Sequence, residues 1–200
     1  MITKFKANNS QYISNCPLPP DFNIFWRQAN QLGCKPKLAT VAKVLLFPAD
    51  LTALGPLVNN IATDSWWGPY MPYESSLDPK LRASDLANMF QDQTGREWVQ
   101  SIGGTYSLFE IAHQAFTSVS DPHDRPEVAD ALHKVNFHGM AGPLDFTSPA
   151  NPAPGVVATP VVGVQWKPTN GGKFPYEMKV VDNTLNPAVK VGADLQPTNP

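Results

Sequence analysis

The side chains that could carry acid–base or metal chemistry are scattered through this sequence and form no catalytic set. The segment SDPHD, residues 120–124, places His123 between Asp121 and Asp124, and each of the three could bind a metal. A loop that leads into a helix explains the same residues, because Asp124 and Glu127 have the spacing of an N-terminal helix cap. The sequence therefore predicts a capped helix here and no metal site.

The other reactive candidates are isolated. Gly103 and Gly104 precede a helical pattern, but without the strand and third glycine of a phosphate loop they predict a tight turn before that helix. His113 lies inside the helical pattern, which favours a surface or packing role, and Asp145 and Glu177 are single carboxylates. No serine elbow, paired zinc ligands or kinase signature occurs. With no nucleophile, base and orienting group together, the sequence predicts neither an enzyme nor a cofactor.

Aromatic side chains are the better candidates, and they predict binding. The segment DSWWGPYMPY, residues 64–73, places two tryptophans and two tyrosines among residues that break regular structure. The aromatic side chains of such an irregular segment need either a core or a ligand. Neighbouring side chains of extended chain point to opposite faces, so we expect one of Trp66 and Trp67 to face a ligand and the other a core.

Composition and the length of the apolar runs argue against a nucleic-acid partner and against a membrane span. The chain has 200 residues, 42% of them hydrophobic, which suffices for one sizeable core or two small ones. A net charge of −2 leaves no basic stripe to neutralise phosphates, so no nucleic-acid partner is predicted. The longest apolar run, residues 44–47, is far shorter than the roughly 20 residues of a membrane span.

The start of the chain lacks the regions of a signal peptide, and MITKFKANNSQY has the character of the inside of a domain. We therefore expect a fragment of a longer protein. Cys16 and Cys34 lie at opposite ends of a predicted helix over residues 20–32, which would separate them by roughly 18 Å. A disulfide needs Cα atoms within about 7 Å. Both are predicted to be buried thiols.

Periodicity divides the chain into three blocks. Residues 11–16 and 35–47 read as strands on either side of the helix over 20–32, a βαβ unit expected to be parallel and right-handed. A helical block follows at about 74–136. Its best helix is predicted to bury a stripe of apolar residues: Leu108, Ile111, Ala112, Ala115 and Val119. From about 137 onward, short strands alternate with Gly, Pro and Asn, and the 21 prolines gather in the connections.

The order of these blocks resembles a known family. The stretches PPDFNIFWRQANQLGCKPKLATVAK, ATDSWWGPYMPY, GGTYSLFEIAHQAF, VADALHKVNFHGMAGPLDF and VVGVQWKP are similar to the C-terminal half of periplasmic solute-binding proteins of branched-chain amino-acid type ABC transporters. The resemblance covers nearly the whole chain, and its most specific parts are the F..F.RQA...G.KPK helix and the F.G..GP..F segment.

The resemblance implies the type I periplasmic-binding-protein fold, two α/β lobes joined by crossover strands that close over a ligand. Residues 1–62 and 156–200 would form the C-terminal lobe, residues 63–73 an interlobe crossover, and residues 74–155 part of the first lobe with a return crossover. Family members are about twice this long, so an N-terminal half would lie outside the chain. We expect that half or a dimer mate to cover the exposed edge of an incomplete sheet.

The resemblance also places candidate ligand contacts. In amino-acid-binding members, the loop before the RQA helix supplies an aromatic residue, and Leu18 stands at about that place. The next strand ends in an acidic residue that pairs with the ligand's ammonium group, and Ala42 and Lys43 replace it. A carboxylate or neutral ligand, aromatic or amino-acid-like, therefore suits Lys43 better than an α-amino group does. The alternative is that Lys43 simply points to solvent.

Four aromatic residues complete the predicted ligand contacts: Trp66, Trp67, Tyr70 and Tyr106. For the tryptophans, the alternative is packing beneath a hinge. The function that the resemblance implies is capture of a small solute in the periplasm and its delivery to an ABC-transporter permease, with a signal peptide in the full-length precursor. A ligand-sensing domain of a receptor or regulator is the alternative with the same fold, and an α/β enzyme is a more distant one.

Overall fold

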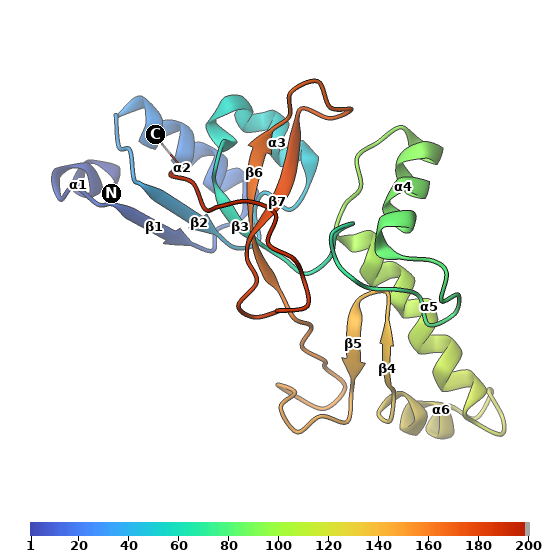
Figure 1. The fold of residues 1–200 in the computed structure, drawn as a ribbon. Coiled ribbons are helices and arrows are strands. Elements are labelled where there is room, and N and C mark those ends of the chain that lie inside the picture. The colour runs from blue at the N-terminus through green and yellow to red at the C-terminus, as the bar shows by residue number, and fades with distance from the viewer. Residues whose placement is uncertain (199–200) are drawn as a thin grey trace. The chain divides into compact units, whose positions relative to one another are not determined.

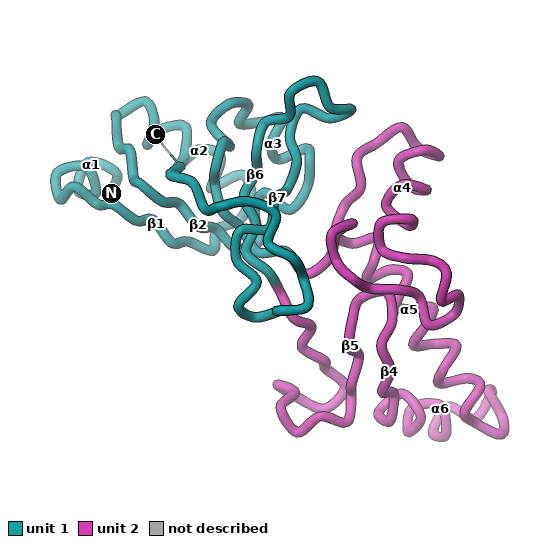
Figure 2. Tube along the Cα trace, viewed as in Figure 1, with its two compact units in different colours: residues 1–65, 162–200 teal, residues 66–161 magenta. Residues whose placement is uncertain are grey.

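A computed structural model describes residues 1–198 of the chain. The chain divides into two compact units, which Figure 2 distinguishes by colour. Unit 1 comprises Met1–Ser65 and Val162–Pro200, and unit 2 comprises Trp66–Val161. The chain therefore passes from one unit to the other twice, after Ser65 and before Val162.

Unit 1 is built on a five-stranded mixed sheet (Figure 1). In spatial order its strands are β1 (Tyr12–Asn15), β2 (Leu38–Val41), β3 (Ala62–Ser65), β6 (Val162–Pro168) and β7 (Tyr176–Asp182). The first three are parallel, whereas β6 is antiparallel to both β3 and β7. Its helices are α1 (Ile2–Ala7), α2 (Pro19–Gln31), α3 (Pro48–Leu54) and the 3-10 turn η1 (Gly55–Val58).

The predicted βαβ unit is confirmed as β1–α2–β2. Pro19 starts α2 where a missing N–H costs nothing, and Phe22, Trp26 and Ala29 recur at helical spacing as its buried face. Phe22 and Trp26 stack with ring centroids 5.8 Å apart, and the Trp26 indole N–H donates to Leu57 O at 2.7 Å. The hydrogen bond to Leu57 holds α2 against η1.

Two expectations in unit 1 were wrong. The strand predicted over residues 35–47 ends at Val41, because the segment 42–47 leaves the sheet as an irregular loop. Cys16 is exposed rather than buried, since it follows the last residue of the edge strand β1 instead of pointing under α2. Cys34 is buried, as predicted.

Unit 2 contains three helices and a two-stranded sheet. These are α4 (Ala83–Thr94), α5 (Ser101–Thr117), α6 (Arg125–Leu132) and the antiparallel pair β4 (Asn136–Gly139) and β5 (Gly142–Asp145). The predicted cap of α6 is confirmed, because the Asp124 carboxylate accepts from the Glu127 backbone N–H at 3.1 Å. Gly95 ends α4 with a left-handed φ of 69°.

The helix α5 differs from its prediction. Gly103 and Gly104 lie inside it rather than in a turn before it. Its buried residues are small or polar: Gly103, Ser107, Glu110 and Ala115. Leu108, expected in the buried stripe, is 65% exposed, because the side of α5 that the rest of unit 2 covers is the one that carries the glycine. No helix within residues 1–198 is both long enough and apolar enough to cross a membrane.

Candidate functional site

The predicted contacts Leu18 and Lys43 lie at one edge of the unit 1 sheet. Strands β1 and β2 are parallel, and their last residues, Asn15 and Val41, are paired in register. The loops that follow them therefore leave the sheet at the same edge, where α/β proteins hold ligands. Leu18 begins α2 by accepting from the Phe22 N–H at 3.0 Å, and its side chain is 62% exposed. The Lys43 side chain is exposed as well.

The loop after β2 carries unusual backbone strain. Lys43 and Leu45 adopt left-handed φ values of 67° and 59°, although neither is a glycine. The neighbouring Val44 and Leu45 side chains are almost completely buried. Such conformations persist only where the surroundings impose them, and they concentrate at functional sites.

Distant residues hold the backbone of this loop at Val44 and Leu45. The Thr63 hydroxyl of β3 donates to Val44 O at 3.1 Å, and the Trp166 indole N–H of β6 donates to Leu45 O at 2.8 Å. Burial raises the pKa of Asp50 in α3, and hydrogen bonds from the backbone of Phe47 and Leu45 oppose that rise. Hydrogen bonds from β3, β6 and α3 thus hold the backbone of this loop, while Lys43 is exposed.

Asp64 is a polar residue at this edge that sequence reasoning missed. Val41 pairs with Thr63 in register, so Asp64 is the β3 neighbour of Ala42, the position where relatives are expected to carry an acid. Its Oδ1 is buried and has no hydrogen-bond partner within residues 1–198. The period-2 alternation of a strand, which puts Asp64 and Trp66 on one face, was the signal available in the sequence.

Trp67 belongs to the core of unit 2. It is completely buried, and its indole N–H donates to Met140 O at 3.0 Å. Its ring lies against Gly103 of α5 so closely that a Cβ there would be 2.1 Å from the indole. Trp98 meets it edge-on, with ring centroids 6.0 Å apart. Trp67 therefore presents no surface to a ligand in this structure.

Trp66 remains the candidate of the pair. It is half-buried, its ring lies against Gly104, and its backbone N–H donates to Gln100 Oε1 at 3.0 Å. Gln100 is 1% exposed, and its Nε2 has no partner among the described residues. That amide N–H₂ group is a second polar feature that sequence reasoning missed.

The two predicted tyrosines lie in different surroundings. Tyr70 packs edge-on against Trp98, with ring centroids 6.1 Å apart, and so joins the cluster around Trp67. Tyr106 of α5 is half-buried, and its hydroxyl is 2.8 Å from the Ser75 Oγ. Tyr106 therefore belongs to α5 and Trp66 lies against it at Gly104, whereas Tyr70 packs on Trp98.

The most elaborate polar cluster of unit 2 is structural. The Glu110 carboxylate is buried and accepts four hydrogen bonds, from Ser76 N at 2.6 Å, Ser76 Oγ at 3.0 Å, Ser107 Oγ at 2.8 Å and Met140 N at 2.8 Å. With its lone pairs used, this carboxylate ties α5 to the β4–β5 turn and has no capacity left for a ligand. The spacing of Ser107 and Glu110 on one helix face was its sequence signal.

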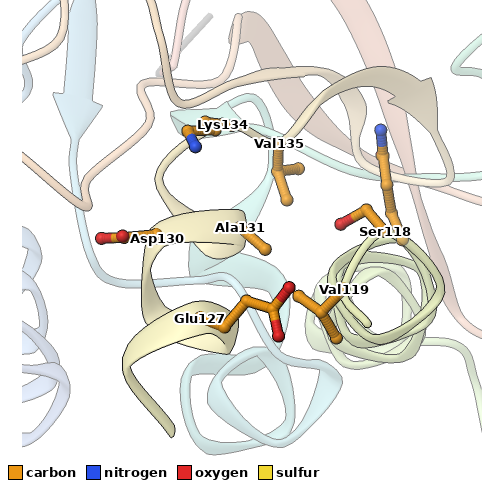
Figure 3. A pocket seen from close by; sticks show the side chains of 8 residues that line it. Ser118, Val119, Glu127, Asp130, Ala131, Lys134 and Val135 are labelled. Atoms are coloured by element: carbon orange, nitrogen blue, oxygen red, sulfur yellow. The ribbon is translucent and has the colours of Figure 1, made fainter. Parts of the chain in front are cut away.

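Two cavities have none of these candidates in their walls. One of about 300 Å³ lies in unit 2, where α6 contributes Glu127 and Ala131 and the chain after α5 contributes Ser118 and Val119 (Figure 3). Hydrogen bonds from the backbone of Ser120 and Asp121 lower the Glu127 pKa, so this carboxylate stabilises its own loop. Another of about 380 Å³ adjoins α1 and β1. Within residues 1–198 no cluster of His, Cys, Asp or Glu could hold a metal ion.

Comparison with known proteins identifies the fold. A family model described as periplasmic binding protein matches residues 1–173. A solved leucine-binding protein from Thermotoga maritima is 19% identical with a TM-score of 0.70, and the match covers 92% of this chain and 47% of that one. The isoleucine complex of a branched-chain amino-acid transporter substrate-binding protein from Streptococcus pneumoniae is 15% identical, with a TM-score of 0.63, covering 90% and 47%.

A third match widens the range of named ligands. A fatty-acid ABC-transporter substrate-binding protein from Thermomonospora curvata is 17% identical with a TM-score of 0.63, covering 96% of this chain and 49% of that one. The chain thus spans about half the length of the structures it matches. None of the curated proteins compared with it matches. The predicted resemblance and the type I periplasmic-binding-protein fold are confirmed.

Proposed function

The chain belongs to the periplasmic binding protein family, and from this premise we propose that it captures a small carboxylate outside the cytoplasm for an ABC-transporter permease. The observation that carries the proposal is the strained loop 42–47, which three other elements hold in place while Lys43 stays exposed. A cation held where the parallel strands end, at the C-terminal edge of the sheet, would recognise an anionic ligand.

The residues around Lys43 define the ligand class. In unit 1, Lys43 would pair with the carboxylate, Leu18 would contact an apolar body, and Asp64 would accept a donor such as a hydroxyl. Trp66 of unit 2 is a separate candidate for an aromatic contact. Ala42 provides no counter-charge of its own for an ammonium group. Two matched structures are named for branched-chain amino acids and for fatty acids. Both of these ligand classes carry a carboxylate.

Binding would work through a shift between open and closed states. Units 1 and 2 would act as lobes, with the two chain passages after Ser65 and before Val162 as hinges. A solute that contacts both lobes only when they are closed shifts the population toward that state. The solute leaves chemically unchanged, so no catalytic residue or cofactor takes part.

A thermal-shift screen tests the ligand class. The purified protein is heated with amino acids, aromatic acids, fatty acids and dicarboxylates. We expect monocarboxylates that lack an α-amino group to raise Tm most, because Ala42 and Lys43 stand where the family's acidic residue would pair with an ammonium group. The matched amides of the same acids, which lack the charge, are the control. Stabilisation by zwitterionic amino acids alone would contradict the role given to Ala42 and Lys43.

A further inference from the structure

The chain after β7 crosses the sheet of unit 1 (Figure 1, dark red). At one end, the Gly192 backbone N–H donates to Val180 O of β7 at 2.8 Å. At the other end, the Thr198 backbone N–H donates to Lys37 O, directly before β2, at 2.8 Å. Strands β6 and β3 lie between β7 and β2 in the sheet. We call residues 192–198 the C-terminal strap.

A buried glutamine of β6 pairs with the middle of the strap. The Gln165 side chain is completely buried, its Nε2 donates to Gln196 O at 2.8 Å, and its Oε1 accepts from the Gln196 backbone N–H at 2.9 Å. These are the two bonds that a residue of a neighbouring antiparallel strand would make. The strap therefore supplies partners that a buried amide requires.

The end of the strap is connected to Trp166 through Asn60. The Thr198 hydroxyl accepts from the Ala39 backbone N–H of β2 at 2.9 Å and donates to Asn60 O at 3.3 Å. Asn60 precedes β3 with a left-handed φ of 60°, and its Nδ2 donates to Pro197 O at 2.9 Å. The Asn60 backbone N–H donates to Trp166 O at 2.9 Å. The strap and β6 thus hold the same residue.

Strand β6 connects the strap with the strained loop 42–47. Gln165 and Trp166 are neighbours in an extended strand, so their side chains point to opposite faces of the sheet. On one face Gln165 bonds to the strap, and on the other the Trp166 indole N–H donates to Leu45 O at 2.8 Å. A displacement of β6 at these two residues would therefore reach the loop.

The strap is held by hydrogen bonds more than by apolar burial. Within it only Thr198 is buried, and Leu195 is 50% exposed, whereas Val189 just before it is completely buried. Trp166 and Leu45, at the other end of the network, are almost completely buried. Segments with few buried apolar contacts open locally at a lower free-energy cost than a core does. The strap is therefore the part of this network that opens first.

We propose that the C-terminal strap is a releasable clamp that controls the anion site of unit 1. When docked, it holds β6 so that Trp166 stays bonded to Leu45 O. When released, it loosens the loop around Lys43 and lowers the affinity of that state for a carboxylate. By linkage, a bound carboxylate then makes release less frequent. The strap lies beyond residues 1–173, which the family model matches. The effect on binding rests on the proposed function, but the coupling of strap and loop does not.

Hydrogen exchange followed by NMR tests the coupling without any solute. Thr198→Val removes the hydroxyl that bonds to the Ala39 N–H, so we expect exchange of the strap's own backbone N–H groups to accelerate about tenfold. Exchange of the Trp166 indole N–H should accelerate by a similar factor. The Trp67 indole N–H of unit 2, which donates to Met140 O, should exchange as in the parent.

Two further variants are the controls. Thr198→Ser keeps the hydroxyl and should behave like the parent. Thr184→Val removes a hydroxyl outside the strap, one that donates to Asp182 Oδ1, and should leave strap exchange unchanged. Unchanged strap exchange in Thr198→Val, or faster strap exchange without faster Trp166 exchange, would overturn the proposal. Equal acceleration at Trp67 would show a general loss of stability and overturn it as well.

The effect on the anion site is measured on the parent protein with phenylacetate and octanoate, an aromatic and an aliphatic carboxylate. At a concentration of about one hundred times its Kd, an acid that binds should slow exchange of the strap and of the Trp166 indole at least about tenfold. Binding that leaves both rates unchanged would overturn the control of the site by the strap. If neither acid binds, the proposed function fails for these carboxylates, and the exchange rates of Thr198→Val still decide the coupling.

Discussion

At the scale of single residues, two glutamates of unit 2 show how the surroundings of a carboxylate determine its role. Glu110 is buried with four hydrogen-bond donors directed at it, so its burial is compensated. Glu97 is also drawn partly out of water, and burial raises its pKa to about 7. Glu97 therefore makes stability depend on pH in the neutral range.

We expect the free energy of unfolding to fall as the pH rises from about 4.5 to 7. The folded state holds the Glu97 proton up to its raised pKa, whereas the unfolded state releases it near 4.5, so the folded state binds more protons across this window. Glu97→Gln removes the titration and should be more stable than the parent by roughly 1–2 kcal/mol at pH 8, a value reduced for partial exposure, and nearly equal at pH 4.

Denaturant unfolding at several pH values measures this difference. Glu74→Gln, at an exposed carboxylate of the same unit, is the control and should follow the parent. A Glu97→Gln variant that tracks the parent at every pH would show that burial does not perturb this group.

At the scale of elements, the adjacent tryptophans and adjacent glycines form one packing unit. Trp67 lies on Gly103 and Trp66 on Gly104, so the two pairs meet where the chain after β3 crosses α5. The Trp67 indole is bonded to Met140 O and cannot slide aside freely. The glycines are needed because an indole occupies the space that a Cβ would take.

Gly103→Ala should destabilise the protein by about 2 kcal/mol, against the usual gain of about 1 kcal/mol for this change inside a helix. The physical reason is that the alanine Cβ would stand 2.1 Å from the indole. Gly104→Ala, where the nearest Trp66 atom is 2.9 Å away, should cost less, and the exposed Thr105→Ala should be neutral. Chemical denaturation gives the order, and a Gly103→Ala variant as stable as the parent would remove Trp67 from this position.

The same elements show what the sequence could predict. The β1–α2–β2 unit and the cap at Asp124 depend on local periodicity and turn residues, and they were predicted correctly. The loop 42–47 was predicted as strand, because its left-handed residues are imposed by Thr63 and Trp166, far away in sequence. The role of the glycines in α5 was missed for a related reason, since the Trp67 ring comes from another segment. Local sequence patterns predict which segments form helices and strands. Contacts with residues distant in the sequence determine where a segment departs from that prediction.

At the scale of the whole molecule, the chain is two units of a periplasmic binding protein, joined by two chain passages and spanning about half the length of its matched structures. Candidate ligand contacts lie in the strained loop 42–47 of unit 1 and around Trp66 of unit 2. The proposed capture of a carboxylate depends on Lys43 more than on any other residue, because Lys43 is the exposed charge on the strained loop.

Titration calorimetry of the carboxylate that raises Tm most, on the parent protein and on Lys43→Ala, tests this proposal most directly. We predict that Lys43→Ala weakens binding at least about tenfold, since a charge-assisted hydrogen bond to a carboxylate is lost. Lys35→Ala, at another exposed lysine of unit 1, should bind like the parent. Unchanged affinity in Lys43→Ala, with heat released equally in all three proteins, would contradict the assignment of the loop 42–47 as the anion site.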